Sequence, residues 1–152
     1  MDWFQVSHLD VERLLAEWRW LCPGPMTLVA RNAFADLFLR DAQGHIFRLD
    51  VGLGQLTRVA ESETEFRERA KTPDKREEWF AESDEKAAAA RGFTPDANES
   101  ISLSIPIIFK EAGSPDTVYV AEIYDTLSFM GSLHRQVAGL PDGTKVRLKV
   151  TE

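Results

Sequence analysis

The chain has 152 residues, of which 43% are hydrophobic and 28% are charged, a composition typical of one folded domain with a substantial core. Its formal net charge of −7 argues against direct nucleic-acid binding, because phosphate contact requires a basic surface, and it favours neutral or basic partners. Acidity also serves solubility, and that interpretation stays open. The single cysteine, Cys22, favours a reducing compartment, and no leader-like or bilayer-spanning apolar segment is present, so we expect a cytoplasmic protein without a membrane partner.

The first expected element is a helix that begins at Ser7 or Asp10 and runs to about Trp20, because apolar residues recur there at helical spacing. Pro23 ends this helix. Cys22 is expected to be partly buried beside it.

Four short strands are expected next, and together they predict an antiparallel meander. The turn-forming sequence Asp41-Ala-Gln-Gly44 predicts a hairpin between the second and third strands. The expected strands cover residues 26–31, 36–41, 46–51 and 55–60.

Two helices are expected after the meander. The first follows Glu61, with Ser62 or Thr64 as its N-cap. The second begins at Pro73, continues through an alanine run and stops before Gly92. Both are expected to pack on the sheet.

The remaining chain predicts strand, strand, helix and strand. Apolar residues alternate over 101–109, which predicts a core strand with Ser100, Ser102 and Ser104 on its solvent face. Pro106 cannot donate to a strand ladder, which indicates an edge strand or a bulge there. A strand over 118–124 is followed by a helix over 125–137 and a last strand over 145–150. The whole chain, 1–152, is therefore predicted to be a single α+β domain with a largely antiparallel sheet and helices packed against it.

No metal site or cofactor is predicted. The three histidines lie far apart in the sequence, and Gly52-Leu-Gly54 lacks the rest of a phosphate-binding loop. His134 lies beside Arg135 on the late helix, where the two residues and Tyr124 form a candidate ligand pocket for an anion. A histidine satisfied by a neighbouring group is the alternative.

Two acidic stripes are the main candidate for a binding surface. Like charges at i, i+4 and i+7 oppose helix formation slightly, so a basic partner would explain why they are kept. Interleaved arginines and lysines allow the alternative of ordinary solvated faces. The stripes consist of Glu61, Glu65 and Glu68 and of Glu78, Glu82 and Glu85.

Three tryptophans are candidates either for the core or for a partner-binding surface. Trp18 shares the apolar stripe of the first helix and is predicted to lie in the core. Trp20 and Trp79 fall off the best apolar faces, which makes each a candidate partner contact, with half-buried packing as the alternative.

Five segments carry a family resemblance through their order and spacing. They are Asn32-Ala-Phe-Ala-Asp-Leu-Phe-Leu-Arg-Asp41, Gly44-His-Ile-Phe-Arg-Leu-Asp50, Val59-Ala-Glu-Ser-Glu-Thr-Glu-Phe66, residues 101–109 and Ser128-Phe-Met-Gly-Ser-Leu-His-Arg-Gln136. Together they resemble a bacterial family named for the C-terminal domain of an immunity protein that neutralises a type VI secretion DNase toxin, and the resemblance covers most of the chain. Family members typically have glycine where Ala35 stands, and often a glycine pair where this chain has Glu111-Ala-Gly-Ser.

The resemblance implies a non-catalytic protein that occludes the active site of a secreted toxin, with a nuclease as one candidate. The toxin partner would be basic, and the six stripe glutamates with Trp79 would contact it. A small-molecule-binding or housekeeping protein of the same fold is the alternative, using the pocket near His134. An enzyme would require Asp36, Asp50 and His134 to converge in one cleft.

Overall fold

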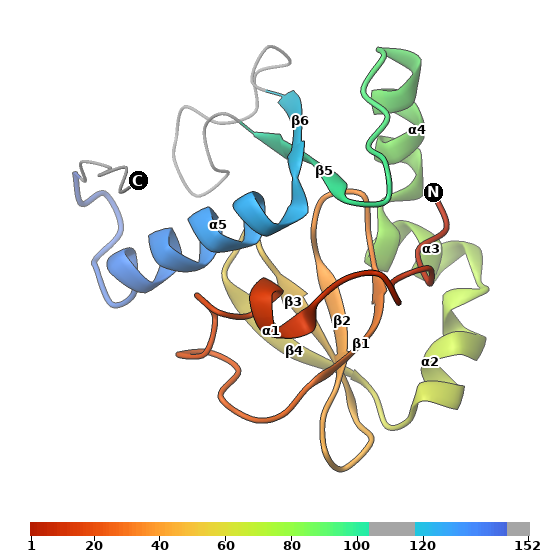
Figure 1. Cartoon of the computed structure of the whole chain (residues 1–152), viewed down its shortest axis with the longest axis horizontal. Helices are drawn as coiled ribbons and strands as arrows, with labels where there is room; N and C mark the ends of the chain where they lie inside the picture. The colour runs from red at the N-terminus through yellow and green to blue at the C-terminus, as the bar shows by residue number, and fades with distance from the viewer. Residues whose placement is uncertain (104–117, 146–152) are drawn as a thin grey trace.

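The computed structural model describes residues 1–103 and 118–145, and this part of the chain has an α+β fold with two antiparallel sheets (Figure 1). The larger sheet has the order β1-β2-β3-β4, and the smaller pairs β5 with β6. The elements are α1 (Val11–Leu14), β1 (Thr27–Arg31), β2 (Leu37–Arg40), β3 (Ile46–Asp50), β4 (Gln55–Ala60), α2 (Glu63–Ala70), α3 (Pro73–Phe80), α4 (Glu82–Ala90), β5 (Glu99–Leu103), β6 (Val118–Glu122) and α5 (Ile123–Val137).

The predicted meander is confirmed, with every strand within about a residue of its expected bounds. Successive strands pair antiparallel, and the β2–β3 register places Leu37 opposite Leu49. The expected hairpin turn closes because Gly44 donates its N–H to the Asp41 carbonyl at 3.1 Å and takes a φ of 89°. Glycine adopts such a positive φ without the steric cost that a side chain adds.

The four-stranded sheet is buried on both faces, so the described fold has a layered core. Leu37 and Leu39 of β2 pack with residues of α1 and α5, whereas Phe38 between them packs with α2 and α3. Alternate residues of a strand point to opposite faces, which is how β2 serves both cores. Phe38 and Phe66 have ring centroids 5.2 Å apart in the second core.

The first helix is much shorter than predicted. Asp10, one of the two expected caps, is its N-cap. The helix α1 ends at Leu14, however, and tighter turns follow. These turns bring Trp18 into the core, where its Nε1 donates to the Leu127 carbonyl of α5 at 2.8 Å. Cys22 is fully buried rather than partly so.

The predicted long helix over 73–91 is wrong, because Ala81 divides it into α3 and α4. Ala81 takes the left-handed φ of 49°, and its N–H caps α3 at the Glu77 carbonyl. Asn32 and Arg48 bind the carbonyls of the last turn, at 3.1 Å to Trp79 and 2.9 Å to Glu78. These contacts satisfy groups that a helix end leaves unpaired and fix α3 to the sheet.

The β5–β6 hairpin joins the rest of the fold through β1 and α5. The Ile101 N–H donates to the Ala33 carbonyl at 2.8 Å. Ser100 and Ser102, predicted on a solvent face, instead contact the Thr126 hydroxyl at 3.2 and 2.9 Å, and Ser100 is buried. The reason is that α5 covers this face of β5. The rest of the strand predicted over 101–109, Ser104, Glu111-Ala-Gly-Ser and most of the last predicted strand lie outside the described residues.

A buried arginine ties β5 to β1. Arg31 donates to the carbonyls of Asn32, Ala97 and Glu99, the last at 2.5 Å. Burial lowers the pKa of its guanidinium to about 10, opposed by the charges of Glu85 and Asp96. Its hydrogen bonds to backbone carbonyls compensate for the loss of water.

Candidate functional site: an acidic cavity between the meander and the hairpin

A cavity of about 520 Å³ lies among one end of the meander, the β5–β6 hairpin, and the first turns of α4 and α5. Its size falls within the range of small-ligand pockets. Among the residues that the structure describes, the wall combines apolar side chains with four carboxylates and one arginine, Arg48. The aromatic residues are Phe34, Tyr119 and Phe129, and the carboxylates belong to Asp36, Asp50, Asp84 and Asp125.

Asp36 is the buried carboxylate of this wall and is neutralised by Arg48. Its Oδ2 accepts from Arg48 Nη2 at 2.7 Å and Nε at 3.2 Å, and its Oδ1 accepts from the Val51 N–H at 3.0 Å. Burial raises the pKa of the Asp36 carboxyl, the Asp50 charge raises it further, and Arg48 opposes both. The Asp36–Arg48 pair therefore contributes little net charge to the cavity.

The other three carboxylates of the wall have no ion pair with any described residue. Asp50 accepts the Leu53 N–H at 2.9 Å, a hydrogen bond from a neutral group. Asp84 and Asp125 are exposed residues in the first turns of α4 and α5. Helix N-termini stabilise carboxylates at such positions, so these charges do not require a cation. The described residues of the wall consequently contribute a net negative charge to the cavity.

The aromatic side of the cavity is unusually open to solvent. Tyr119 is 43% exposed and Phe129 is 42% exposed, while Phe34 is half-buried. Large apolar side chains exposed together in a hollow are typical of binding sites. The site therefore offers apolar contact and negative charge at once.

Asn32 shapes the turn that carries Phe34 and Asp36 into the cavity wall. Its Oδ1 accepts from the N–H groups of Phe34 at 2.9 Å and Asp36 at 3.0 Å. Within this turn Ala35 takes a φ of 75°, the left-handed region that favours glycine. The backbone here thus follows a path that glycine adopts more easily than alanine.

The glutamates of the predicted acidic stripes form ion pairs within the molecule. Ala81 places Glu78 on α3 but Glu82 and Glu85 on α4, so the second stripe does not follow one helix. Each of the six glutamates has a cationic partner: Glu61 with Arg58, Glu65 with Arg69, Glu68 with Lys71, Glu78 with Lys75, Glu82 with Arg76 and Lys86, and Glu85 with the N-terminal amino group.

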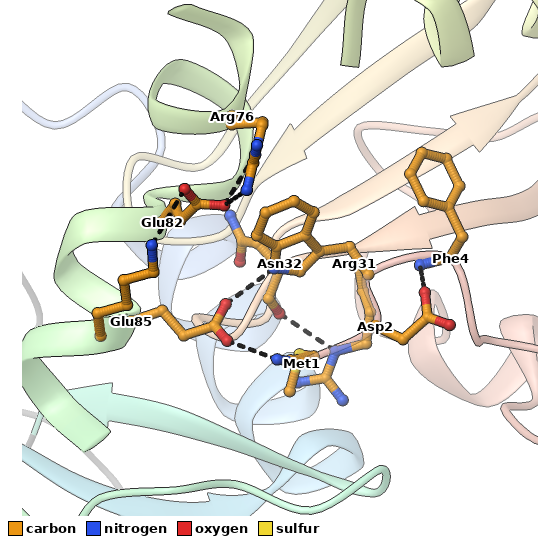
Figure 2. A network of polar contacts seen from close by, with 10 residues as sticks. Met1, Asp2, Phe4, Arg31, Asn32, Arg76, Glu82 and Glu85 are labelled. Atoms are coloured by element: carbon orange, nitrogen blue, oxygen red, sulfur yellow. Dashed lines mark hydrogen bonds and ion pairs between the residues drawn. The ribbon is translucent and has the colours of Figure 1, made fainter. Parts of the chain in front are cut away.

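Figure 2 shows how two of these glutamates serve the fold. Glu85 accepts from the Met1 amino group at 2.9 Å and from Trp3 Nε1 at 2.8 Å, so it holds the N-terminal segment against α4. Trp3 in turn stacks on Phe80, with ring centroids 4.4 Å apart. Glu82 accepts from both Arg76 Nε and Nη2.

The two candidate tryptophans differ. Trp79 is 1% exposed and stacks on Phe66 in the second core, so the prediction of a partner contact there is wrong. Trp79 and Phe80 both belong to the second core, so the end of α3 that carries them packs against the sheet. Trp20 is 39% exposed, and Trp18 is in the core as predicted.

The predicted pocket of Tyr124, His134 and Arg135 is not formed. Tyr124 and His134 are ten residues apart on α5, or about 15 Å along the helix. The Tyr124 hydroxyl accepts a hydrogen bond from the Asp10 N–H at 2.9 Å. Arg135 forms an ion pair with Glu17, with 3.5 Å between Nη2 and Oε2. His134 is 5% exposed and donates from Nε2 to the Val51 carbonyl at 2.8 Å, which is the satisfied histidine of the alternative interpretation.

The residues considered for catalysis are only partly brought together. Asp36 and Asp50 line the acidic cavity, whereas His134 lines a separate hollow of about 370 Å³ with Trp20 and Leu53. Within 1–103 and 118–145, no three histidine, cysteine or acidic side chains are placed to hold a metal ion. None of the helices described is long and apolar enough to cross a bilayer.

The cavity residues Asp84, Asp125, Tyr119 and Phe129 were not singled out from the sequence. They come from three elements whose approach depends on the break at Ala81 and on the packing of α5. No local spacing signals that approach. No known family model matches the sequence, and no curated protein is significantly similar to it.

Proposed function

We propose that the chain is a non-catalytic binding protein that holds a basic partner protein at the acidic cavity. The observation that supports this most is one hollow that combines exposed aromatic rings with three carboxylates, Asp50, Asp84 and Asp125, that form no ion pair with another described residue. Protein interfaces gain most of their affinity from buried aromatic and charged contacts of this kind. The resemblance to immunity proteins supports a secreted toxin as the partner and the cytoplasm as the compartment.

Charge would act in two ways in this role. The net charge of −7 attracts a basic partner over a distance of about 8–10 Å at physiological salt and accelerates encounter. The stripe glutamates are already paired with arginines and lysines, so they contribute little to close contact. Asp50, Asp84 and Asp125 have no cation among the described residues, so a basic partner can supply their counter-ion.

Occlusion needs no catalytic group. A nuclease toxin presents basic residues where it binds the phosphate backbone, and a protein with an acidic hollow can cover that surface. We therefore propose occlusion of a basic active site as the mechanism, with a nuclease as the preferred class of toxin.

The test is affinity capture from the source organism with three tagged forms of the full chain. A cavity variant carries Asp50→Asn, Asp84→Asn and Asp125→Asn, and a stripe variant carries Glu61→Gln, Glu65→Gln and Glu68→Gln, so both lose three charges. The wild type and the stripe variant should retain one stoichiometric basic protein that the cavity variant loses. Recovery of the chain alone from all three would refute the proposal.

A small-molecule-binding protein is the second candidate, and the volume of the cavity favours it. Native mass spectrometry of the purified chain distinguishes the two. A bound metabolite that the cavity variant loses, together with no protein partner, would support this alternative.

A further inference from the structure

We infer that the cavity receives a projecting loop of the partner whose tip carries one basic side chain, with its aliphatic stem against the aromatic rings and its charged head at the carboxylates. This inference rests on the proposed function and adds the chemistry of the group that enters. Lysine and arginine both have a long apolar stem that ends in a cation. The two halves of the cavity wall correspond to these two parts.

The aromatic half suits the stem. Tyr119 on β6 and Phe129 on α5 are both more than 40% exposed, so each has surface to bury on binding. Aromatic faces also attract cations, because the ring quadrupole is negative above its plane. The cavity volume of about 520 Å³ exceeds what one side chain fills, which is why we infer a loop rather than an isolated residue.

The acidic half suits the head. Asp36 has its cation in Arg48, but Asp50, Asp84 and Asp125 have none among the described residues. An apolar group would remove water from these charges without replacing it, and an anion would be repelled. Because no three acidic side chains of the described wall are placed to share a metal ion, a cationic organic group fits it better than a metal ion.

The first experiment titrates the full ¹⁵N-labelled chain with butylammonium and butylguanidinium chloride, followed by NMR. We expect binding with a dissociation constant of about 1 mM or weaker for ligands of this size. Shifts should concentrate at the amides of Tyr119, Asp125 and Phe129. Butanol and butyrate, which keep the stem and lose the cation, should cause no saturable shifts there.

The second experiment repeats the titration with both variants. The cavity variant should bind the cations at least tenfold more weakly, and the stripe variant should bind them as the wild type does. Thermal unfolding of each variant shows whether it folds. If the triple variant does not fold, the single variants Asp84→Asn and Asp125→Asn provide milder substitutions on the solvent side of the wall.

The third experiment adds the captured partner to the wild type saturated with butylguanidinium. Weakened capture would support entry of a basic side chain into this cavity. Capture that is unaffected by the cations and by the cavity variant would overturn this inference and leave a basic partner bound elsewhere. Cation binding at the cavity with no protein partner in any extract would refute the proposed function and reassign the site to a free organic cation.

Discussion

Removal of the Asn32 side chain provides the strongest test of how the cavity wall is held. Asn32 is 1% exposed, and its amide bridges the β1–β2 turn and the end of α3. In Asn32→Ala, the Trp79 carbonyl and the Asp36 N–H lose these partners in the interior, and the half-buried Phe34 N–H loses a third bond. Each buried polar group left without a partner costs about 1–3 kcal/mol.

The expected loss in free energy of unfolding is therefore about 2–7 kcal/mol, counting the two buried groups fully and the third in part. The free energy of unfolding of natural domains is only about 5–15 kcal/mol, so the urea concentration at the midpoint of unfolding should fall clearly. Tryptophan fluorescence suits this assay because Trp79 lies at the affected contact. Asn98→Ala, at an exposed position, is the matched control and should change stability by less than about 0.5 kcal/mol.

A loss below about 1 kcal/mol in Asn32→Ala would refute this reasoning. It would mean that water or a shifted backbone satisfies the three groups. The role of Asn32 in fixing the turn at Ala35 would then be wrong.

Three further predictions concern the fold. Gly131→Ala places a methyl group about 2.7 Å from the Glu17 carbonyl oxygen, and the resulting shift should outweigh the better helix propensity of alanine and lower Tm by about 2–8 °C, measured by calorimetry. Ala81→Gly removes the strain of a left-handed φ and should raise stability by about 0.5–1 kcal/mol in urea unfolding; a loss would contradict the cap. Burial raises the pKa of the Cys22 thiol, so a thiol reagent at pH 7 should react only after unfolding, and rapid reaction of the native chain would exclude this burial.

The meander was predictable because its information is local. Alternation of apolar residues marks the strands, and Asp41-Ala-Gln-Gly44 marks a turn whose geometry only certain residues adopt easily. Ser62 and Asp10 were likewise predictable as caps, because a side-chain oxygen before a helix binds the first N–H groups. Such signals need no knowledge of the tertiary fold.

The break between α3 and α4 was not predictable, because Ala81 is a good helix former and carries no signal of a turn. Contacts distant in sequence impose it, namely the hydrogen bonds of Asn32 and Arg48 to the end of α3. The same break buries Trp79 and separates Glu78 from Glu82. A helical pattern read over 73–91 therefore gave a false acidic stripe and a false surface tryptophan.

The candidate site depends on the same long-range contacts. Asp50, Asp84 and Asp125 lie in three elements, and only the packing of α4 and α5 around the meander brings them to one cavity. Acidic residues are numerous in the sequence, so no spacing distinguishes these three. Charge composition favoured a basic partner, and we propose the acidic cavity rather than the glutamate stripes as its binding surface.

The central claim is that a basic partner binds at the acidic cavity, and hydrogen exchange of the chain with and without the captured partner tests it most directly. The account predicts new protection at β6 and at the first turns of α4 and α5, which is lost in the cavity variant. Protection confined to α2, with the cavity amides unchanged, would contradict it and return the interface to the glutamates of the first stripe.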